Sequence, residues 1–419
     1  MSSPKNPATA PSPALGPSSE RMLSPGGLRG AVAQLLARIR GGDLGSVPVI
    51  VGLVVIWSVF QALNPVFLSS RHLVDLTMQC AAIGTIALGI VLVLLVGEID
   101  LSVGSVSGLA AAVLAVTLVQ LQWNLVLALL AAVAVGCLVG VLYGLLYTRF
   151  GVPSFVITLA GLLGFLGLQL WVLGDTGSIN LPFDSWIVQF AQQMFLPAWA
   201  SYVGVVLTVA AYAWTRTRQA QRRTAANLVS QSYREIAVRS IVLLVLLLAA
   251  VWYLNLWRGV GVMFLFFIAL VVVANFALTR TRWGRAVYAV GGSVEAARRA
   301  GIRVNRIYIS VFALCSSLAA VGGILAAARL AAVNQSSGGG DTNLNAIAAA
   351  VIGGASLFGG RGTAFSAVLG IIVIQSISSG LILLNLDSSV AFMITGVVLV
   401  LAVIVDSISR RTRAATGRA

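Results

Sequence analysis

Two places in this sequence carry residue types that could do chemistry, and both interrupt long apolar stretches. The first is VGEIDLSVGSVSG, Val96 to Gly108, where Glu98 and Asp100 break an otherwise apolar run. Ionisable side chains at such a place are costly in a membrane, so they indicate a substrate path or a brace for a moving gate. The alternative is that Asp100 or Ser102 caps the next helix while Glu98 is solvated beside it. Both interpretations stay open.

The second place is Thr279 to Arg306, a charged island of seven arginines in a sequence that is only 9% charged. It contains the signals of one short helix: Ser293 as N-cap, Glu295 in the first turn, basic residues in the last turn and Gly301 after the end. A helix of about two turns is not stable alone in water. The pattern therefore predicts that another protein docks on it, and the alternative is a solvated connector.

Other chemistries find little support in the sequence. Three cysteines lie far apart in apolar runs, and His72 is the only histidine, so no metal or disulfide pattern and no nucleophile set is evident. Glu98 and Asp100 form the only pair that could serve a proton-coupled transporter. Lys5 is the only lysine, which excludes a GxxxxGK[ST] phosphate-binding loop.

The composition places these residues in a membrane. With 59% hydrophobic residues and 43 glycines, the chain is too apolar for a water-soluble globule and predicts an all-α, polytopic membrane protein. The net charge of +15 does not indicate nucleic-acid binding, because the basic residues flank apolar runs and form no single stripe. Three cysteines are read as small buried hydrophobes: Cys80, Cys137 and Cys315.

A membrane-crossing helix needs about 20 apolar residues, and this length predicts about twelve crossings. They are placed near 47–63, 73–97, 101–119, 123–147, 153–173, 187–214, 241–257, 259–279, 307–331, 344–358, 363–384 and 389–406. The segments between them that fall on one side hold 23 of the 27 basic residues, as the positive-inside rule requires. Both termini are therefore expected in the cytoplasm of a bacterial cell, with the chain a multi-pass protein of the cytoplasmic membrane.

The expected domains follow from this topology. A disordered cytoplasmic tail (1–46) precedes a membrane domain (47–408), and a basic cytoplasmic tail (409–419) ends the chain. The membrane domain contains an arginine-rich cytoplasmic insert (215–240) and the charged loop (280–306). The run 344–358 is short and leads into glycines, Gly353 to Gly362, so we expect a broken or re-entrant helix there. Since the break after Val96 has a similar form, an internal pseudo-repeat is suspected.

Four ordered motifs carry a specific resemblance. They are GEIDLSVGS (97–105), VPSFVITLAG (152–161), the stretch 284–302 that ends in AVGGSVEAARRAGI, and LNAIAAAVIGGASLFGGRG (344–362). Together they resemble the permease subunits of ATP-binding cassette (ABC) importers for monosaccharides, the ribose and xylose permease family. The insert and its helical pair extend the ten-span ribose-type pattern, so the chain is most similar to the xylose-type members. One departure is Asn343-Leu344-Asn345, where relatives usually carry an acidic residue first.

The resemblance implies partners and a mechanism. The loop would be a coupling helix that docks on a separate ATPase subunit, which would hold ATP and magnesium, so this chain would need no cofactor and would be no enzyme. An extracytoplasmic sugar-binding protein and a second copy of the chain would complete the importer, in contact with membrane lipid. The coupling residues would be Gly292, Ser293, Glu295, Ala296, Ala297, Arg298, Arg299 and Gly301.

The expected cargo is a monosaccharide, xylose or a similar pentose, which crosses as the gates alternate. A neutral, hydroxyl-rich substrate calls for polar groups along its path, although each candidate could instead join two helices by a hydrogen bond. The candidates are Glu98, Asp100, Ser102, Ser105, Thr158, Gln169, Asn343 and Asn385. The alternative function is a proton-coupled secondary sugar transporter that uses Glu98 and Asp100.

Overall fold

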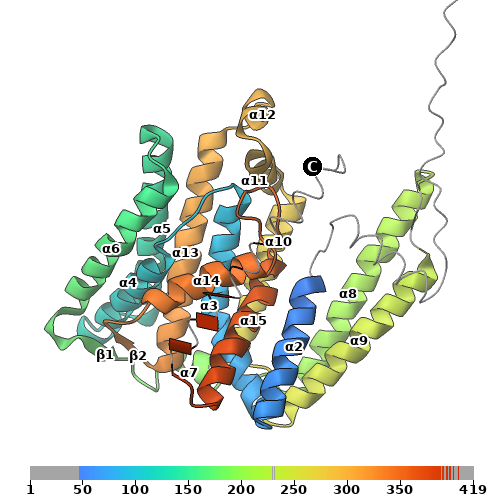
Figure 1. Ribbon diagram of the computed structural model, residues 1–419, viewed down its shortest axis with the longest axis horizontal. Coiled ribbons are helices and arrows are strands. Elements are labelled where there is room, and N and C mark those ends of the chain that lie inside the picture. The colour runs from blue at the N-terminus through green and yellow to red at the C-terminus, as the bar shows by residue number, and fades with distance from the viewer. Residues whose placement is uncertain are drawn as a thin grey trace, which may run out of the picture. The chain divides into compact units, whose positions relative to one another are not determined.

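The computed structural model describes residues 47–228, 230, 232–387, 389–390, 393–394, 396–397, 400 and 404. Both expected tails, and most of the expected last span at 389–406, lie outside the described residues. Within the described part the chain is helical apart from one small pair of strands (Figure 1). Strand β1 (Ser178–Asn180) pairs antiparallel with β2 (Ala332–Asn334). The predicted all-α fold is confirmed.

Nine helices in this part of the chain are long and apolar enough to cross a membrane. They are α3 (Ser70–Leu95), α4 (Val103–Ala115) with its π-helical continuation η1 (Val116–Gln120), α5 (Leu125–Phe150), α6 (Ser154–Leu173), α8 (Ala198–Ala225), α9 (Tyr233–Asn255), α10 (Val262–Arg280), α13 (Val304–Leu330) and α15 (Phe365–Leu383). A shorter apolar helix, α2 (Val47–Leu63), precedes them. The predicted polytopic membrane protein is thus confirmed.

Helices α3 and α13 form the centre of the bundle. The apolar stretch of α3 is 89% buried by other parts of the protein, whereas that of α9 is only 11% buried. Helix α13 packs against α3, α4 and α5. On α5, Gly136 and Gly140 let the two backbones approach closely, because a Cβ atom at Gly136 would lie 2.6 Å from the carbonyl oxygen of Ser316.

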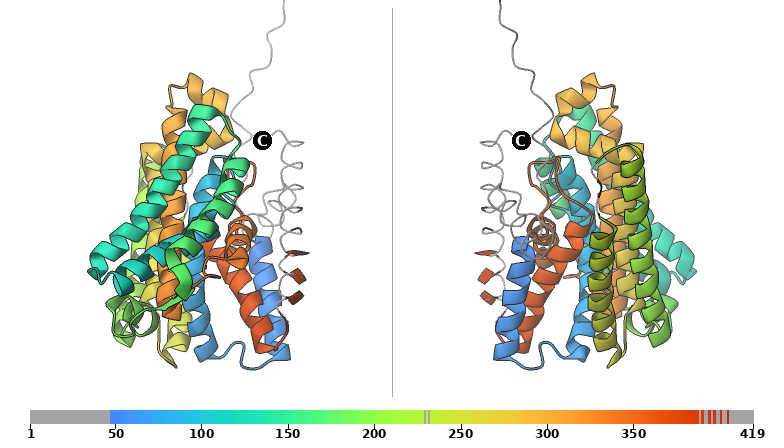
Figure 2. Two further views of the ribbon diagram at one scale, coloured as in Figure 1. Left: turned by 90° about the vertical axis from the view of Figure 1, so that its left-hand side faces the viewer. Right: turned by 90° about the vertical axis from the view of Figure 1, so that its right-hand side faces the viewer.

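Helix α2 packs along α15 (Figure 2). The indole Nε1 of Trp57 donates a hydrogen bond to Ser376 Oγ at 2.9 Å, and Asn64 Nδ2 donates to the Leu383 carbonyl at 3.1 Å. Because polar groups in lipid need partners within the protein, these two bonds tie the first described helix to the last complete one.

One helix of the bundle is too short to cross a membrane. Helix α14 (Gly340–Ile352) has 13 residues, so at 1.5 Å per residue it spans only about 20 Å and cannot cross the hydrocarbon core. It is followed by non-helical chain, residues 353–364, before α15 begins. The expected span at 344–358 is therefore wrong in its extent, while the broken helix predicted there is confirmed. Gly354, just after the helix end, and Gly359, within the loop, have φ of 99° and 82°, a region that favours glycine.

The expected single span at 187–214 is also wrong in its boundaries. A 3₁₀ turn, η2 (Gly174–Thr176), and strand β1 lead to a short helix, α7 (Trp186–Gln192), which ends before Pro197. Proline lacks a backbone N–H and starts helices well, so α8 begins directly after it. Helix α8 then runs through the first part of the arginine-rich insert to Ala225, since Arg, Gln and Ala favour helix.

Candidate functional site

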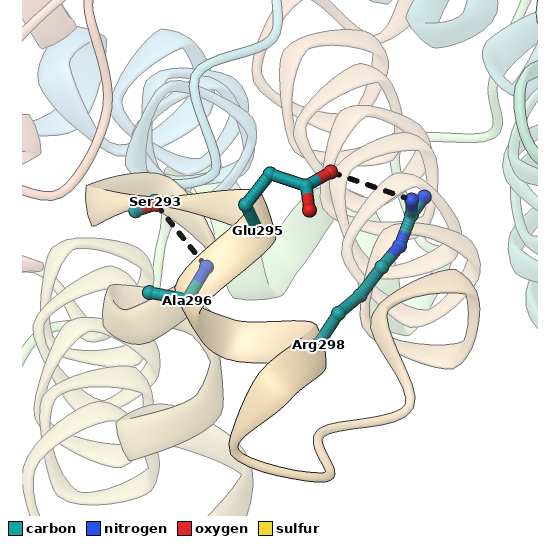
Figure 3. Close-up of polar contacts among 4 residues, drawn as sticks. All are labelled: Ser293, Glu295, Ala296 and Arg298. Atoms are coloured by element: carbon teal, nitrogen blue, oxygen red, sulfur yellow. Dashed lines mark hydrogen bonds and ion pairs between the residues drawn. The ribbon is translucent and has the colours of Figure 1, made fainter.

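The short helix predicted in the charged loop is present as α12 (Val294–Arg299), shown in Figure 3. The hydroxyl of Ser293 accepts a hydrogen bond from the backbone N–H of Ala296 at 3.3 Å, so the predicted N-cap is confirmed. Gly301 has a φ of 78°, the left-handed conformation expected after the helix end. Glu295 and Arg298 form an ion pair at 3.7 Å. Because their side chains are 70% and 60% exposed, this pair adds little stability.

The expected coupling residues divide into an exposed set and one anchor. Ala297 is 3% exposed and packs into the protein's own core, so it holds α12 in place and is not available to a partner. The remaining seven are exposed: Gly292, Ser293, Glu295, Ala296, Arg298, Arg299 and Gly301. Helix α12 therefore presents an exposed surface, while the buried Ala297 anchors the helix to the bundle.

Helix α11 (Arg282–Gly292) joins α12 to the bundle, and the sequence analysis did not anticipate it as a separate helix. Thr281 caps its start by accepting the N–H of Gly284 at 3.1 Å. The indole of Trp283 donates to Ser310 Oγ on α13 at 2.8 Å. The hydroxyl of Tyr288 donates to the Gly362 carbonyl at 2.8 Å, and its burial raises the pKa of this phenol, so the hydroxyl stays a donor.

Three segments meet where α11 ends. The N–H of Gly360 donates to the Leu95 carbonyl at 2.9 Å, joining the glycine loop to the end of α3. A Cβ atom at Gly291 would overlap that same Leu95 carbonyl and lie 2.6 Å from Gly360 N, so the backbones touch. We call these three residues, Leu95, Gly291 and Gly360, the glycine junction. The junction thus places the end of α11 against the end of α3 and against the loop that follows α14.

The carboxylate of Asp100, in the segment between α3 and α4, lies at the centre of a buried network. Asp100 is fully buried and accepts hydrogen bonds from the N–H and the hydroxyl of Ser102, at 2.8 and 2.7 Å. Tyr143 of α5 donates to Ser102 Oγ at 2.8 Å, and the Cys315 thiol of α13 lies 3.8 Å from Asp100. Burial raises the pKa of the Asp100 carboxyl, and the bonds from Ser102 oppose that shift. The network braces α4 against α5 and α13.

Glu98 is partly exposed, and it has a partner as well. The Tyr147 hydroxyl donates to Glu98 Oε1 at 2.6 Å, and the Tyr147 ring contacts that of Tyr308 on α13 in a tilted arrangement, with centroids 4.7 Å apart. Ser102 lies at the N-cap position of α4, but its side chain makes no capping hydrogen bond there. Asp100 accepts the N–H of Ser102 itself, so neither residue caps the first turn as the alternative supposed, and Glu98 is not simply solvated. Sequence reasoning missed Tyr143 and Tyr147, although their spacing of four places both on one face of α5.

Of the other path candidates, Gln169 and Asn343 lie beside α4. Gln169 Nε2 donates to the Ser337 carbonyl at 2.9 Å, and Asn343 Nδ2 donates to the Leu101 carbonyl at 2.6 Å. Their side-chain oxygens, Gln169 Oε1 and Asn343 Oδ1, are buried without a hydrogen-bond partner in the described structure. Such orphaned acceptors can take hydrogen bonds from water or from a hydroxyl-rich ligand.

The remaining candidates are placed differently. Ser105 Oγ donates to the Leu162 carbonyl of α6 at 2.8 Å, a bond between helices. Thr158 Oγ1 donates to the Ser154 carbonyl within its own helix at 2.9 Å. Asn385 follows the end of α15, is exposed and has a φ of 52°. The helix-to-helix alternative thus fits Ser105, while the arrangement gives no shared site that includes Thr158 or Asn385.

A bundle of apolar helices with one broken member and an exposed, anchored helix between spans fits a membrane transport protein. Residues 72–403 match the family described as branched-chain amino acid transport system / permease component, and the chain belongs to this family. It is therefore a multi-pass transport permease component. The family resemblance predicted from the four motifs is confirmed.

Individual relatives agree with this assignment. The chain is 35% identical over 345 residues to the xylose transport system permease protein XylH of Escherichia coli strain K12, covering 82% of this chain and 87% of the relative. XylH of Haemophilus influenzae is 31% identical, with 86% and 96% covered. The ribose import permease protein RbsC of E. coli K12 is 30% identical, with 85% and 92% covered. No solved structure matches the chain.

Proposed function

We propose that this chain is the membrane-spanning subunit of an ABC importer that carries a pentose, with xylose as the first candidate, across the cytoplasmic membrane. The observation that carries the proposal is α12. Its exposed surface is anchored by the buried Ala297, and α11 connects it through the glycine junction to the end of α3 and to the loop after α14. The names of the relatives point to xylose ahead of ribose, because identity to XylH of E. coli is 35% and to RbsC 30%.

The chain needs an energy source outside itself. Its sequence contains no lysine that could complete a GxxxxGK[ST] loop, so ATP and magnesium would bind to a partner ATPase subunit. The ATPase would hold the exposed side chains of α12, Glu295 and Arg298 among them. Two copies of this chain would pair with two ATPase subunits, and an extracytoplasmic binding protein would deliver the sugar.

Coupling would run from α12 to the path through backbone contacts. ATP binding would move α12 and α11, and the glycine junction would pass the movement to the end of α3 and to the loop after α14. The Asp100 network lies in the segment that follows the junction, between α3 and α4, and the orphaned oxygens of Gln169 and Asn343 lie beside α4. These two amide oxygens are suited to accept hydrogen bonds from the hydroxyl groups of a neutral sugar.

The test is sugar uptake in proteoliposomes that contain the chain with its ATPase and binding protein. Glu295→Arg reverses a charge on the docking surface, and we expect loss of both ATP-dependent uptake and ATPase association. Glu235→Arg is the matched control, because Glu235 is an exposed acidic residue in the first turn of another helix, α9, and should leave both unchanged.

Two outcomes would overturn the proposal. If the chain alone moves sugar in response to a proton gradient and Glu295→Arg is silent, it is a proton-coupled transporter, and Glu98 and Asp100 become the residues to study. If uptake needs ATP but labelled xylose is not carried while another monosaccharide is, the importer assignment stands and the xylose assignment fails.

A further inference from the structure

An arginine-lined cavity lies beside the bundle, away from α12 and the Asp100 network. Residues of α8, α10 and the first turn of α15 line it, and its volume is about 890 Å³. Helices α8 and α10 start at the same end of the molecule, because Leu196 and Val260, which directly precede them, share a hydrogen bond of 2.9 Å. Their arginine-bearing ends therefore point to the same end of the molecule, where α10 leads into α11 (Figure 1).

The cavity concentrates positive charge without a counter-charge. Four arginines line it, Arg216, Arg218 and Arg222 from α8 and Arg280 from α10, and no acidic residue is among its described lining. The one ion pair in the described part of the chain is Arg298 with Glu295, so none of the four has a carboxylate within reach there. Arginine stays charged at any physiological pH, so their mutual repulsion favours a bound anion.

Aromatic rings orient two of these arginines. The guanidinium of Arg218 lies 4.2 Å from the centre of the Trp214 ring, and that of Arg216 lies 5.4 Å from the Tyr212 ring. Trp214 and Tyr212 also line the cavity, and Phe365 of α15 forms a further apolar wall. The site therefore combines arginines for a phosphate with aromatic surface, the mixture found at membrane interfaces.

The helices next to the cavity are apolar and exposed. Val206 and Leu207 of α8 are 51% and 64% exposed, and Val273 of α10 is 65% exposed. The apolar stretch of α8 is only 17% buried by protein, so in a bilayer lipid chains cover most of it. An anion bound between the arginines would thus lie above acyl chains, as a phospholipid headgroup does.

We propose that this cavity binds the phosphate of an anionic phospholipid headgroup from the inner leaflet. Basic pockets between membrane helices on the cytoplasmic side are suited to such headgroups. The bound lipid bridges α8 of the inserted helical pair and α10, whose last residue, Arg280, is separated from α11 by Thr281 alone. A free phosphate shares the same chemistry, but it gains nothing from the aromatic wall or the exposed apolar faces.

The experiment measures lipid binding to the purified full-length chain by native mass spectrometry in a neutral detergent. Phosphatidylglycerol is the anionic probe, phosphatidylcholine is the zwitterionic probe, and inorganic phosphate is the competitor. The variant R218Q/R222Q removes two cavity arginines. Its matched control, R234Q/R239Q, removes the same charge from exposed arginines of α9 that do not line the cavity.

We expect R218Q/R222Q to bind phosphatidylglycerol roughly 30-fold more weakly, because each arginine near an anionic lipid contributes about fivefold in affinity. The control should bind as the unchanged chain does, and phosphatidylcholine should bind more weakly than phosphatidylglycerol. Arg280→Gln, on the opposite wall, should weaken binding about fivefold on its own, so the result does not depend on one variant's folding.

Equal weakening in the α9 control would overturn the proposal, since the effect would then reflect surface charge alone. Full displacement of phosphatidylglycerol by millimolar inorganic phosphate would also overturn it, because the cavity would then be a free-anion site. Uptake activity is not needed for this test, so its outcome is independent of the proposed transport function.

Discussion

Asp100 shows how a single charged residue is accommodated in this apolar protein. Its carboxylate is fully buried, yet the N–H and hydroxyl of Ser102 both donate to it, and Tyr143 extends the network to α5. A buried carboxylate without such donors would cost several kcal/mol. The residue therefore acts first as a brace, and any part in gating would operate through the helices that it joins.

The glycine junction yields the sharpest prediction at the residue scale. Gly291→Ala places a methyl group against the Leu95 carbonyl, and we expect about 1–3 kcal/mol of destabilisation from overpacking, together with reduced ATP-dependent uptake. Thermal unfolding in detergent and uptake in proteoliposomes measure the two effects.

Gly292→Ala is the matched control for the thermal-unfolding measurement. It is the next residue in α11, and a Cβ atom there would meet nothing within 4 Å. Since both substitutions add the same methyl group to the last turn of the same helix, their difference isolates the contact with Leu95. If the two variants unfold at the same temperature, the close approach of Gly291 to Leu95 does not limit the packing there.

At the scale of elements, α12 depends on its N-cap, Ser293, and on its buried residue, Ala297. It has only six residues, which is too short for a stable isolated helix, so Ser293 and the buried Ala297 must hold it. Helix α14 is also short, but here the short length has a different consequence. Because α14 ends before it could cross the membrane, the glycine loop that follows it can contact Leu95.

Ser293→Ala tests the cap directly. Loss of the hydroxyl that accepts the Ala296 N–H should cost about 1 kcal/mol, which corresponds to about fivefold faster hydrogen exchange of the α12 amides. Ser293→Asp keeps an acceptor at the same position and should exchange like the unchanged chain. Equal protection in the alanine variant would mean that packing alone, through Ala297, maintains the helix.

At the scale of the whole molecule, the positive-inside rule predicts the orientation in the membrane from the positions of the arginines. The arginine-rich end of α8 and the charged loop with α12 should face the cytoplasm, and the loop that carries Asp184 should face outward. The same orientation places the arginine-lined cavity in the inner leaflet, where anionic lipid headgroups are attracted to basic residues.

Labelling of single cysteines with a membrane-impermeant maleimide tests this orientation. Asp184→Cys should react in intact right-side-out vesicles, whereas Gln221→Cys should react only after permeabilisation; both positions are exposed. The unchanged chain sets the background, since Cys80 and Cys315 are buried and Cys137 lies within the span α5. The reverse labelling pattern would contradict the positive-inside assignment.

The sequence by itself determined the class of protein, the positions of most spans and the capped helix at Ser293. These features are local, because apolar length, arginine placement and cap residues act within a few turns of chain. Only the tertiary structure decided that Ala297 is an anchor, and that Tyr143 and Tyr147 reach the Asp100 network and Glu98. Those features depend on contacts between segments far apart in sequence, such as Gly291 with Leu95 and Gly360, which no local pattern records.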